Sequence, residues 1–331
     1  MSELALAAFA AETGMHLVDE PRGGDFRAFR RRFDADGYAA SLSARGIRWI
    51  GRAADLYPPL LAALPDPPPG LFLRGSGDPE LLRGRLVAIV GARACSSYGA
   101  EVARMLGRDV AAAGVVVVSG LARGIDGAAH RGALEAGGTT IAVLGCGIDR
   151  DYPAAHRELA SRICGSGAVV SEYAPGVEPA PWRFPARNRI IAGLAEATII
   201  VEARERSGAL ITAEFALEAG REVFAVPGQI TSALSLGTNG LLRAGAAAPL
   251  LGADDVLAEL GVEPSAPAGV ELSEPARVVL ERLGDSPGSA DELTRATGLD
   301  AATIAAALAE LELAGQAAGA DGVYRGVRPQ G

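Results

Sequence analysis

Six short runs of apolar, mostly β-branched residues constrain the fold of this chain more than any other feature of its sequence. Each run is continuous, whereas a strand with one exposed face alternates apolar and polar residues, so the runs indicate strands buried on both faces. Segments with helical spacing lie between them. Buried strands that alternate with helices form a mostly parallel sheet with helices on each side. The runs are 86–91 (LVAIVG), 115–120 (VVVVSG), 140–145 (TIAVLG), 168–172 (AVVSE), 197–202 (ATIIVE) and 222–228 (EVFAVPG).

This alternation divides the chain into regions. Residues 83–260 are predicted to form the core of an α/β protein, an extended Rossmann-like, doubly wound and mostly parallel sheet. Residues 1–82 are rich in Arg, Ala and Pro, and we expect a small N-terminal region and connector there. A Pro/Ala/Gly-rich linker is expected over 261–272. Residues 273–331 show three helical patterns and a hairpin, the order of a winged-helix-like domain, with Asp300 as N-cap of the third helix.

The charge of the chain bears on its partners. A formal net charge of -9 and an isoelectric point near 5.0 count against a nucleic-acid partner, because sequence-independent binding depends on phosphate neutralisation by Lys and Arg. The segment 271–331, however, holds ten acidic residues and five arginines, so much of the negative charge can lie away from a site. The chain contains no lysine, and its arginines offer a planar fork that binds phosphate oxygens in pairs.

Several classes of protein do not fit this sequence. No apolar stretch reaches the roughly 18 residues that a membrane span needs, and Glu3 and Glu12 argue against a secretory signal, so we expect a soluble, cytoplasmic protein without a membrane partner. The cysteines and histidines lack the spacing of a disulfide framework or a metal site, which predicts no metal and no cofactor. No catalytic triad, carboxylate pair or lysine nucleophile emerges, so we expect a binding protein rather than an enzyme.

Glycine-rich turns follow the first three runs, at the edge where a parallel sheet binds its ligands. Glycine lets the backbone turn tightly, and each following helix offers unpaired N–H groups to an anion. Each turn region also carries an arginine that suits a phosphate. In the first turn the alternative is a tight turn with Arg93 in solvent. The candidate residues are Gly91, Arg93 and Ser96 in the first turn, Ser119, Gly120, Arg123 and Gly124 in the second, and Gly147 and Arg157 after the third run.

Two further residues beside these turns have open roles. Asp126 stands near the start of the helix after the second run and is expected to cap it. Tyr152, at the start of the helix after the third run, suits stacking on a nucleic-acid base, and the alternative is an ordinary packing role.

The segment 184–194, FPARNRIIAGL, gathers cations in front of an apolar run. Arg187, Asn188 and Arg189 are candidate ligand-binding residues. The two arginines lie two positions apart near a helix start, where neighbours on one face lie three or four apart, so they cannot both face the same way. One is expected to face the ligand, and the other to pair with an internal carboxylate such as Glu202.

A further candidate anion site follows the fifth run. Ser207 and Gly208 begin a predicted helix whose first N–H groups could hold a phosphate, with Thr212 one turn on. Together with the arginines, this helix start predicts several anion pockets at one edge of the sheet, which suit a nucleotide or a nucleic-acid strand. Binding dominated by the phosphate backbone has a steep salt dependence and little base preference.

Taken in order, these motifs resemble the DNA-processing protein A family, also called DprA or Smf. The motifs are GARACSSYG, SGLARGIDGAAH, LGCGIDRDYP, SEYAPG, FPARNRIIAGL, the segment 201–228 and GTNGLLRAGA, and the resemblance covers roughly 50–250 continuously. It implies an extended Rossmann fold without enzymatic activity that binds single-stranded DNA irrespective of sequence. It also implies a homodimer that loads the RecA recombinase onto incoming DNA in natural transformation or recombination.

The resemblance also assigns roles to residues. It implies that Arg93 contacts phosphate, with Ser96 and the turn at 119–120 beside it. Family members often have a lysine where this chain has Arg157, which preserves the charge, and an asparagine where it has His156. Some members carry a C-terminal winged helix, and the resemblance implies that this domain contacts other proteins more often than it recognises DNA.

Proteins of another class share the fold and part of the pattern. The Rossmann-like nucleoside-monophosphate phosphoribohydrolases of the lysine-decarboxylase-like family have an arginine-containing helix start and a Gly-Thr-Glu segment, and Gly208, Thr212 and Glu214 stand here in roughly that order. The chain lacks the PGGxGT core of that family, so we prefer the DNA-binding hypothesis. A third hypothesis is an interaction scaffold whose oligonucleotide binding is absent or insensitive to salt.

Overall fold

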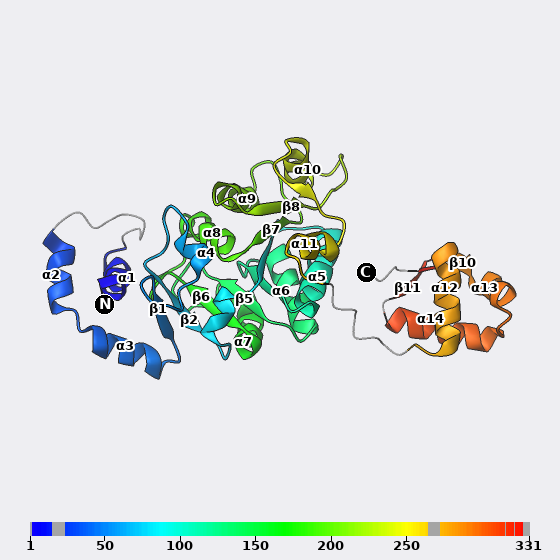
Figure 1. Ribbon diagram of the computed structural model, residues 1–331, viewed down its shortest axis with the longest axis horizontal. Coiled ribbons are helices and arrows are strands. Elements are labelled where there is room, and N and C mark those ends of the chain that lie inside the picture. The colour runs from blue at the N-terminus through cyan, green and yellow to red at the C-terminus, as the bar shows by residue number, and fades with distance from the viewer. Residues whose placement is uncertain (1, 15–23, 264–271, 315, 321, 327–331) are drawn as a thin grey trace. The chain divides into compact units, whose positions relative to one another are not determined.

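The computed structural model describes residues 2–14, 24–263, 272–314, 316–320 and 322–326 (Figure 1). The chain forms two compact units, Met1–Glu263 and Pro264–Gly331. Most of the linker expected over 261–272 falls at 264–271, outside the described residues. None of the helices described is long and apolar enough to cross a membrane.

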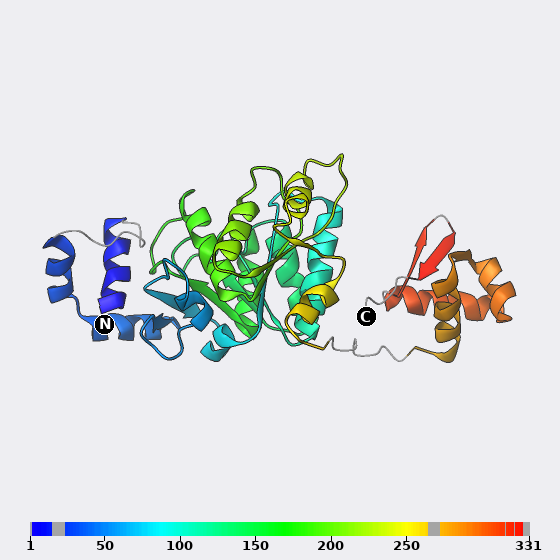
Figure 2. The ribbon, with the colours of Figure 1, turned by 45° about the horizontal axis from the view of Figure 1, so that its top comes forward.

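A single sheet of nine strands runs through the described part of the first unit (Figures 1 and 2). Its strands are β1 (Arg48–Gly51), β2 (Gly70–Arg74), β3 (Leu86–Val90), β4 (Val116–Ser119), β5 (Thr140–Val143), β6 (Ala168–Ser171), β7 (Ala197–Ile200), β8 (Glu222–Ala225) and β9 (Ala248–Pro249). The order is β1-β2-β6-β5-β4-β3-β7-β8-β9. Strands β3 to β9 run parallel, whereas β2 pairs antiparallel with β6 and β1. The six predicted runs contain β3 to β8, which confirms the predicted α/β sheet.

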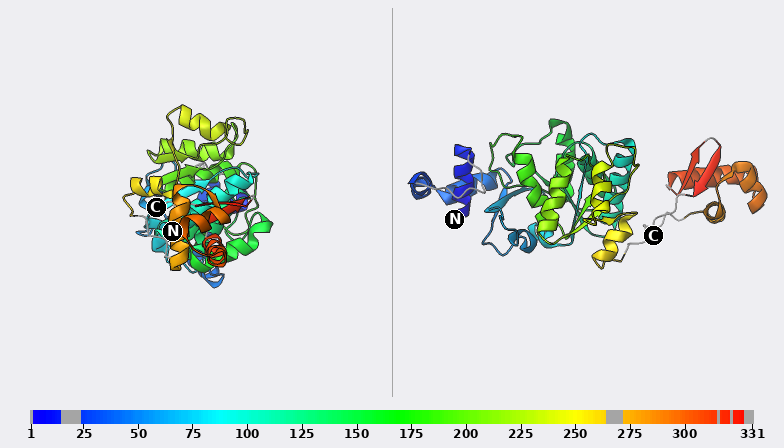
Figure 3. Two further views of the ribbon diagram at one scale, coloured as in Figure 1. Left: turned by 90° about the vertical axis from the view of Figure 1, so that its right-hand side faces the viewer. Right: turned by 90° about the horizontal axis from the view of Figure 1, so that it is seen from above.

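Helices cover both faces of this sheet (Figure 3). The α-helices of the first unit are α1 (Ser2–Thr13), α2 (Gly24–Arg32), α3 (Ala35–Ala44), α4 (Pro59–Ala62), α5 (Ser97–Ala112), α6 (Ile125–Glu135), α7 (Arg157–Ser166), α8 (Arg183–Leu194), α9 (Gly208–Glu218), α10 (Leu236–Arg243) and α11 (Ala253–Glu259), and its 3-10 helices are η1 (Pro79–Arg83) and η2 (Ala154–His156). Helices α4, α8 and α9 pack on one face. Helices α5, α6, α7 and α11 pack on the other, which gives the doubly wound arrangement.

Alternate side chains of the central strands enter different hydrophobic clusters. In β3, Ala88 and Val90 pack with residues of α8 and α9, whereas Val87 and Ile89 pack with residues of α5 and α6. All four are at most 3% exposed. Complete burial of an aliphatic side chain contributes about 1.5–3 kcal/mol, so a strand between two helical layers gains stability from an apolar residue at every position.

Residues 48–82 extend the sheet. Strand β2 pairs with β6, and Leu71, Phe72 and Leu73 are fully buried. The boundary predicted at residue 82 therefore does not coincide with a boundary between compact units, since Met1–Glu263 forms one unit. Strand β1 (RWIG) begins with a charged residue, and β2 (GLFLR) directly follows a proline-rich segment and has no β-branched residue, so neither has the pattern by which the other strands were recognised.

An ion pair fixes helix α8 to the segment after β6. The Arg189 guanidinium donates to both carboxylate oxygens of Glu172, at 3.1 and 2.8 Å, and its Nε donates to Asp66 at 3.0 Å. Arg189 and Glu172 are 2% and 1% exposed. Burial opposes the charged form of Arg189, and its attraction to Glu172 outweighs this effect, so the pKa of Arg189 is raised. Removal of either residue would leave the charge of the other buried and unpaired, which is strongly destabilising.

The second unit has the helices and small sheet of a winged helix. Its elements are α12 (Glu274–Asp285), β10 (Gly288–Ser289), α13 (Ala290–Thr297), α14 (Ala301–Leu313), β11 (Ala317–Ala320) and β12 (Val323–Gly326). The predicted N-cap is confirmed, because Asp300 accepts hydrogen bonds from the N–H groups of Ala302 and Thr303, both at 3.0 Å. The three helices enclose a core that includes Ile304 and Leu311.

The buried ion pair generates a prediction about stability. Arg189→Met leaves Glu172 buried without its bidentate partner, so the free energy of unfolding, measured by urea denaturation, should fall by about 3–5 kcal/mol. Arg104→Met is the matched control, because Arg104 forms an exposed pair with Glu135 at 2.6 Å, and its loss should cost about 1 kcal/mol or less. Equal losses in the two variants would contradict the role assigned to Arg189.

Candidate functional site

The carboxyl ends of the parallel strands meet at one edge of the sheet, and the following helices begin there. Helices α5, α6, α7 and α9 start beyond β3, β4, β5 and β7. Strands β3 and β7 are neighbours although they lie far apart in the sequence. Such a switch in strand order opens a crevice between strand ends, where ligands of doubly wound sheets bind.

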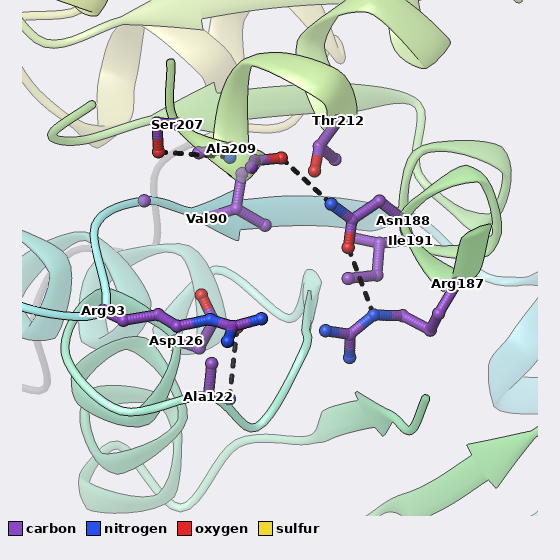
Figure 4. A pocket seen from close by; sticks show the side chains of 12 residues that line it. Val90, Arg93, Ala122, Asp126, Arg187, Asn188, Ile191, Ser207, Ala209 and Thr212 are labelled. Carbon is purple, nitrogen blue, oxygen red and sulfur yellow. Dashed lines mark hydrogen bonds between the residues drawn. The ribbon is translucent and has the colours of Figure 1, made fainter. Parts of the chain in front are cut away.

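A pocket of about 240 Å³ occupies this edge (Figure 4). Six of the fourteen predicted site residues line it, namely Gly91, Arg93, Arg187, Asn188, Ser207 and Gly208. The other lining residues are Val90, Ala122, Asp126, Ile191, Ala209 and Thr212. The pocket thus joins the segments after β3 and β4 to the helices α8 and α9.

Arg187 is 3% exposed, and its guanidinium group joins two strand ends. Its Nη1 donates to the carbonyl of Gly120 at 2.7 Å, just after β4, and to the carbonyl of Val143, the last residue of β5. Its Nε donates to Oδ1 of Asn188 at 3.2 Å. Burial lowers the pKa of Arg187 to about 10, so the side chain is cationic at neutral pH. The wall of the pocket therefore carries a fixed positive charge.

The turn after β4 makes room for this guanidinium group. A Cβ at Gly120 would lie 2.6 Å from both terminal nitrogens of Arg187. Ser119, before it, is fully buried, and its hydroxyl donates to the carbonyl of Ile89 at 2.6 Å. Both residues were predicted to bind a ligand. In the structure Gly120 instead holds the guanidinium group of Arg187, and the Ser119 side chain is buried between β4 and β3.

The start of α9 forms another wall of the pocket. Ser207 is the N-cap, and its hydroxyl accepts from the N–H of Ala209 at 3.3 Å, as the predicted helix start requires. The carbonyl of Gly208 accepts from Nδ2 of Asn188 at 3.0 Å, while Oδ1 of Asn188 accepts from Arg187. An 11-residue helix thus begins at the pocket, and its N-terminus favours negative charge there.

Arg93 is exposed and lies in the turn after β3. Figure 4 shows its guanidinium group and that of Arg187 pointing toward one another. The guanidinium carbon of Arg93 lies 5.1 Å from the ring centroid of Phe184, and Phe184 stacks on Tyr152 with centroids 5.3 Å apart. A cation and two rings thus form a stack, which sequence reasoning missed because its members come from three separate segments.

Asp126 supplies the carboxylate of the pocket. It lies buried in the first turn of α6, where its Oδ2 accepts from the N–H of Ala122 at 3.2 Å. The N-cap of α6 is Gly124, whose φ of 75° favours glycine and whose added Cβ would lie 2.3 Å from the carbonyl oxygen of Ala92. Burial raises the pKa of Asp126, and the nearby charge of Arg187 acts against this rise. The charged carboxylate weakens the attraction of the pocket for anions.

Three more predicted residues lie at the same edge without lining the pocket. Arg123, in the turn before α6, and Arg157, the first residue of α7, are exposed. Gly147 is buried after β5, where its N–H donates to the carbonyl of Val177 at 2.8 Å. The two arginines are accessible to a ligand, whereas Gly147 shapes the loop.

The structure separates the roles of Arg187 and Arg189. Arg187 lines the pocket, and Arg189 forms the internal ion pair, as their spacing predicted. The suggestion that Glu202 is the internal partner is wrong, because that partner is Glu172. Glu202 instead accepts from the N–H and the hydroxyl of Ser96, at 2.9 and 2.6 Å.

Ser96 therefore lies outside the pocket that Arg93 and Arg187 line. As the N-cap of α5, it places the Glu202 carboxylate at the start of that helix, where an external anion was predicted. Ser96, Tyr98 and Glu202 line a second cavity of about 550 Å³ together with residues of the segment 227–235. An internal carboxylate thus occupies one of the predicted anion sites.

Comparison with known proteins identifies the family of the chain. Residues 48–261 match the family model described as DNA recombination-mediator protein A, well over half of the chain. This chain belongs to the DNA recombination-mediator protein A family. Residues 263–322 match the DprA winged helix domain, which confirms the prediction for the second unit.

Relatives in the DprA/Smf family extend over much of the chain. DNA processing protein DprA of Streptococcus pneumoniae is 49% identical over 205 residues, which are 62% of this chain and 71% of that protein. Protein Smf of Escherichia coli is 39% identical over 283 residues, which are 82% of this chain and 75% of that protein.

Two solved structures share the fold. DprA of Streptococcus pneumoniae superimposes with a TM-score of 0.66 at 40% identity, over 79% of this chain and 93% of that one. DNA processing protein A of Helicobacter pylori superimposes with a TM-score of 0.57 at 32% identity, over 61% of this chain and 92% of that one. The latter was studied for its mode of binding single-stranded DNA.

Gly120→Ala tests the packing around Arg187. The added Cβ would displace the guanidinium group and break its hydrogen bond to the carbonyl of residue 120, so the free energy of unfolding should fall by about 1.5–3 kcal/mol. Gly165→Ala in α7 is the control, because no heavy atom lies within 4 Å of its added Cβ. Alanine is favoured over glycine in helices, so that variant should be at least as stable as the wild type. A fully stable Gly120→Ala protein would show that the guanidinium group is not held at this turn.

Proposed function

We propose that this chain binds single-stranded DNA at the carboxyl edge of its sheet, protects incoming DNA and loads the RecA recombinase onto it in natural transformation or recombination. The observation that carries the proposal is the convergence of Arg93 and Arg187 on one pocket at the N-terminus of α9. Guanidinium groups and helix N-termini both bind phosphate oxygens directly.

Exposed cations continue along the same edge. Arg93 follows β3, Arg123 follows β4 and Arg157 follows β5, and these three strands are consecutive in the sheet. A single strand that crosses the three strand ends would meet one arginine at each. Tyr152, 44% exposed and stacked on Phe184, offers a ring face to a base beside this row.

Family membership supports the wider role. The Helicobacter pylori relative, studied for its binding of single-stranded DNA, shares the fold with this chain. The homodimer and the contact with RecA come from the family resemblance. Light scattering of the purified protein tests the dimer, and assembly of RecA filaments on strands coated with single-strand-binding protein tests loading. A monomer, or filament assembly that the protein does not accelerate, would contradict these two parts.

The position of Glu214 counts against the phosphoribohydrolase alternative. That hypothesis takes Glu214 as the acidic group after Gly208 and Thr212. Glu214 is exposed on α9 and does not line the pocket. The pocket therefore lacks the Gly-Thr-Glu arrangement on which the hypothesis depends.

Arg93→Ala and Arg157→Ala test the row of cations. Each should weaken binding of oligonucleotides uniformly across base sequences and reduce the slope of log affinity against log salt by about 0.7–1, the effect of one lost phosphate contact. Fluorescence anisotropy at several salt concentrations measures both quantities. Arg108→Ala is the control, because Arg108 lies on α5 in an exposed pair with Asp109. Unchanged slopes in both test variants would remove these arginines from the site.

Asp126→Asn tests the charge of the pocket. The amide keeps an acceptor for the N–H of Ala122 and removes the negative charge that the carboxylate carries above its raised pKa, so the variant should bind a single strand more tightly than the wild type at a pH above that pKa. Because the pKa of Asp126 is raised, wild-type affinity should increase as the pH falls through that pKa, and the variant should show less of this increase. Anisotropy titrations between about pH 4.5 and pH 8 measure the difference. Weaker binding by Asp126→Asn would show that the carboxylate contributes to binding.

A further inference from the structure

Helix α2 carries a cluster of arginines in a segment that the family comparison does not reach. The matched residues are 48–261 and 263–322, whereas α2 spans Gly24–Arg32. Its nine residues hold four arginines and one acid, Asp25, in a chain whose net charge is -9. The arginines, all exposed, are Arg27, Arg30, Arg31 and Arg32. We call them the α2 arginine cluster.

The spacing of the cluster concentrates its charge. Arg27, Arg30 and Arg31 stand at positions i, i+3 and i+4, so they are neighbours on one face of the helix. Like charges at this spacing destabilise a helix, although cations in its last turn interact well with the helix dipole. None of the four forms an ion pair with another described residue. The helix thus presents uncompensated positive charge at some cost to its own stability.

Aromatic packing holds the opposite face of α2. Phe29 is buried and lies 5.3 Å from Phe9 of α1 and 5.3 Å from Phe33, measured between ring centroids. Phe26 lies 5.4 Å from Phe9, and Phe33 lies 5.4 Å from Tyr38 of α3. These contacts fix the rotation of the helix about its axis, so the arginine face is turned toward solvent by packing rather than by chance.

We propose that the α2 arginine cluster is a second binding surface for the phosphates of single-stranded DNA, separate from the pocket at the sheet edge. This inference rests on the proposed function, because it extends the same ligand over a second part of the protein. A row of exposed guanidinium groups pairs with consecutive phosphates of a polyanion and releases their counterions. The surface lengthens the strand that one protein molecule binds.

Two other anionic partners fit the helix less well. An amphipathic helix that binds a membrane inserts its apolar face into the lipid, but Phe26 and Phe29 of α2, with Phe33 just after it, pack against α1 and α3. A protein interface has a fully desolvated apolar or aromatic core, and the exposed face of α2 consists of arginines, Asp25 and Ala28. Phosphate pairing without apolar contact suits a nucleic-acid backbone.

The test compares short and long strands with a variant of the full chain. The variant carries Arg27→Gln, Arg30→Gln and Arg31→Gln, which remove three charges and retain good helix formers. The probes are oligo-dT of about 6 and about 40 nucleotides, the first long enough for one local site only. The long strand should bind the variant at least tenfold more weakly, with a salt slope lower by about 2, because three phosphate contacts of a single strand are lost. Affinity for the short strand should not change.

Two control variants separate position from overall charge. Arg277→Gln, Arg282→Gln and Arg295→Gln remove three charges from α12 and α13 and should leave binding of the long strand unchanged. Replacement of Arg27, Arg30 and Arg31 by lysine should retain most of the affinity. Circular dichroism of each variant checks that it is folded.

The outcomes are distinguishable from those of the proposed function. Failure of the wild type to bind either oligonucleotide would overturn the proposed function. Normal wild-type binding, with equal affinity and salt slope in the α2 variant, would overturn the second surface alone. Vesicles of phosphatidylcholine and phosphatidylserine serve as a further probe. Vesicle binding that is lost in the variant while DNA binding is kept would assign the cluster to a membrane surface instead.

Discussion

The candidate site depends on one buried guanidinium group held where two strands end. The partners of Arg187 are the carbonyl oxygens of Gly120 and Val143 and the amide oxygen of Asn188. Carbonyl and amide oxygens orient a guanidinium group without cancelling its charge. Carbonyl groups at a strand end, beyond the last hydrogen bond to a neighbouring strand, need another donor. At the ends of β4 and β5 this donor is Arg187, so the sheet edge fixes the position of its guanidinium group. The positive charge of the pocket is thus a consequence of the strand order.

The neighbouring arginine on the same helix has a different role. Arg189 ends in a bidentate pair with Glu172 and fixes α8 against the segment after β6. This pair determines where the rest of the helix lies, and therefore where Arg187 lies two positions earlier. The two arginines of one helix therefore point in different directions. Arg189 forms a buried ion pair, and Arg187 brings its positive charge to the pocket.

Local sequence patterns predict much of the fold, whereas most of the predictions that failed concern contacts between residues far apart in the sequence. The continuous runs predicted β3 to β8, the Ser207-Gly208 pair was predicted to begin α9, and Asp300 was predicted as the N-cap of α14. Glu172 and Glu202 both follow a buried strand, so only the strand order and the position of Ser96 decide which one meets Arg189. The strands β1, β2 and β9 were missed because none of them is a run of β-branched residues: β1 is RWIG, β2 is GLFLR and β9 has only two residues. The stack on Phe184 was missed because its members are remote in sequence.

The most direct test of a binding site for single strands at this sheet edge is the affinity of the intact protein for an oligonucleotide and for its duplex, each at two salt concentrations. If several phosphates contact a row of arginines, the single strand should bind more tightly than the duplex, and its affinity should fall steeply as salt increases. Absent binding, or binding that salt does not weaken, would contradict the account. Release of free base from nucleoside monophosphates without affinity for single strands would instead support the hydrolase hypothesis.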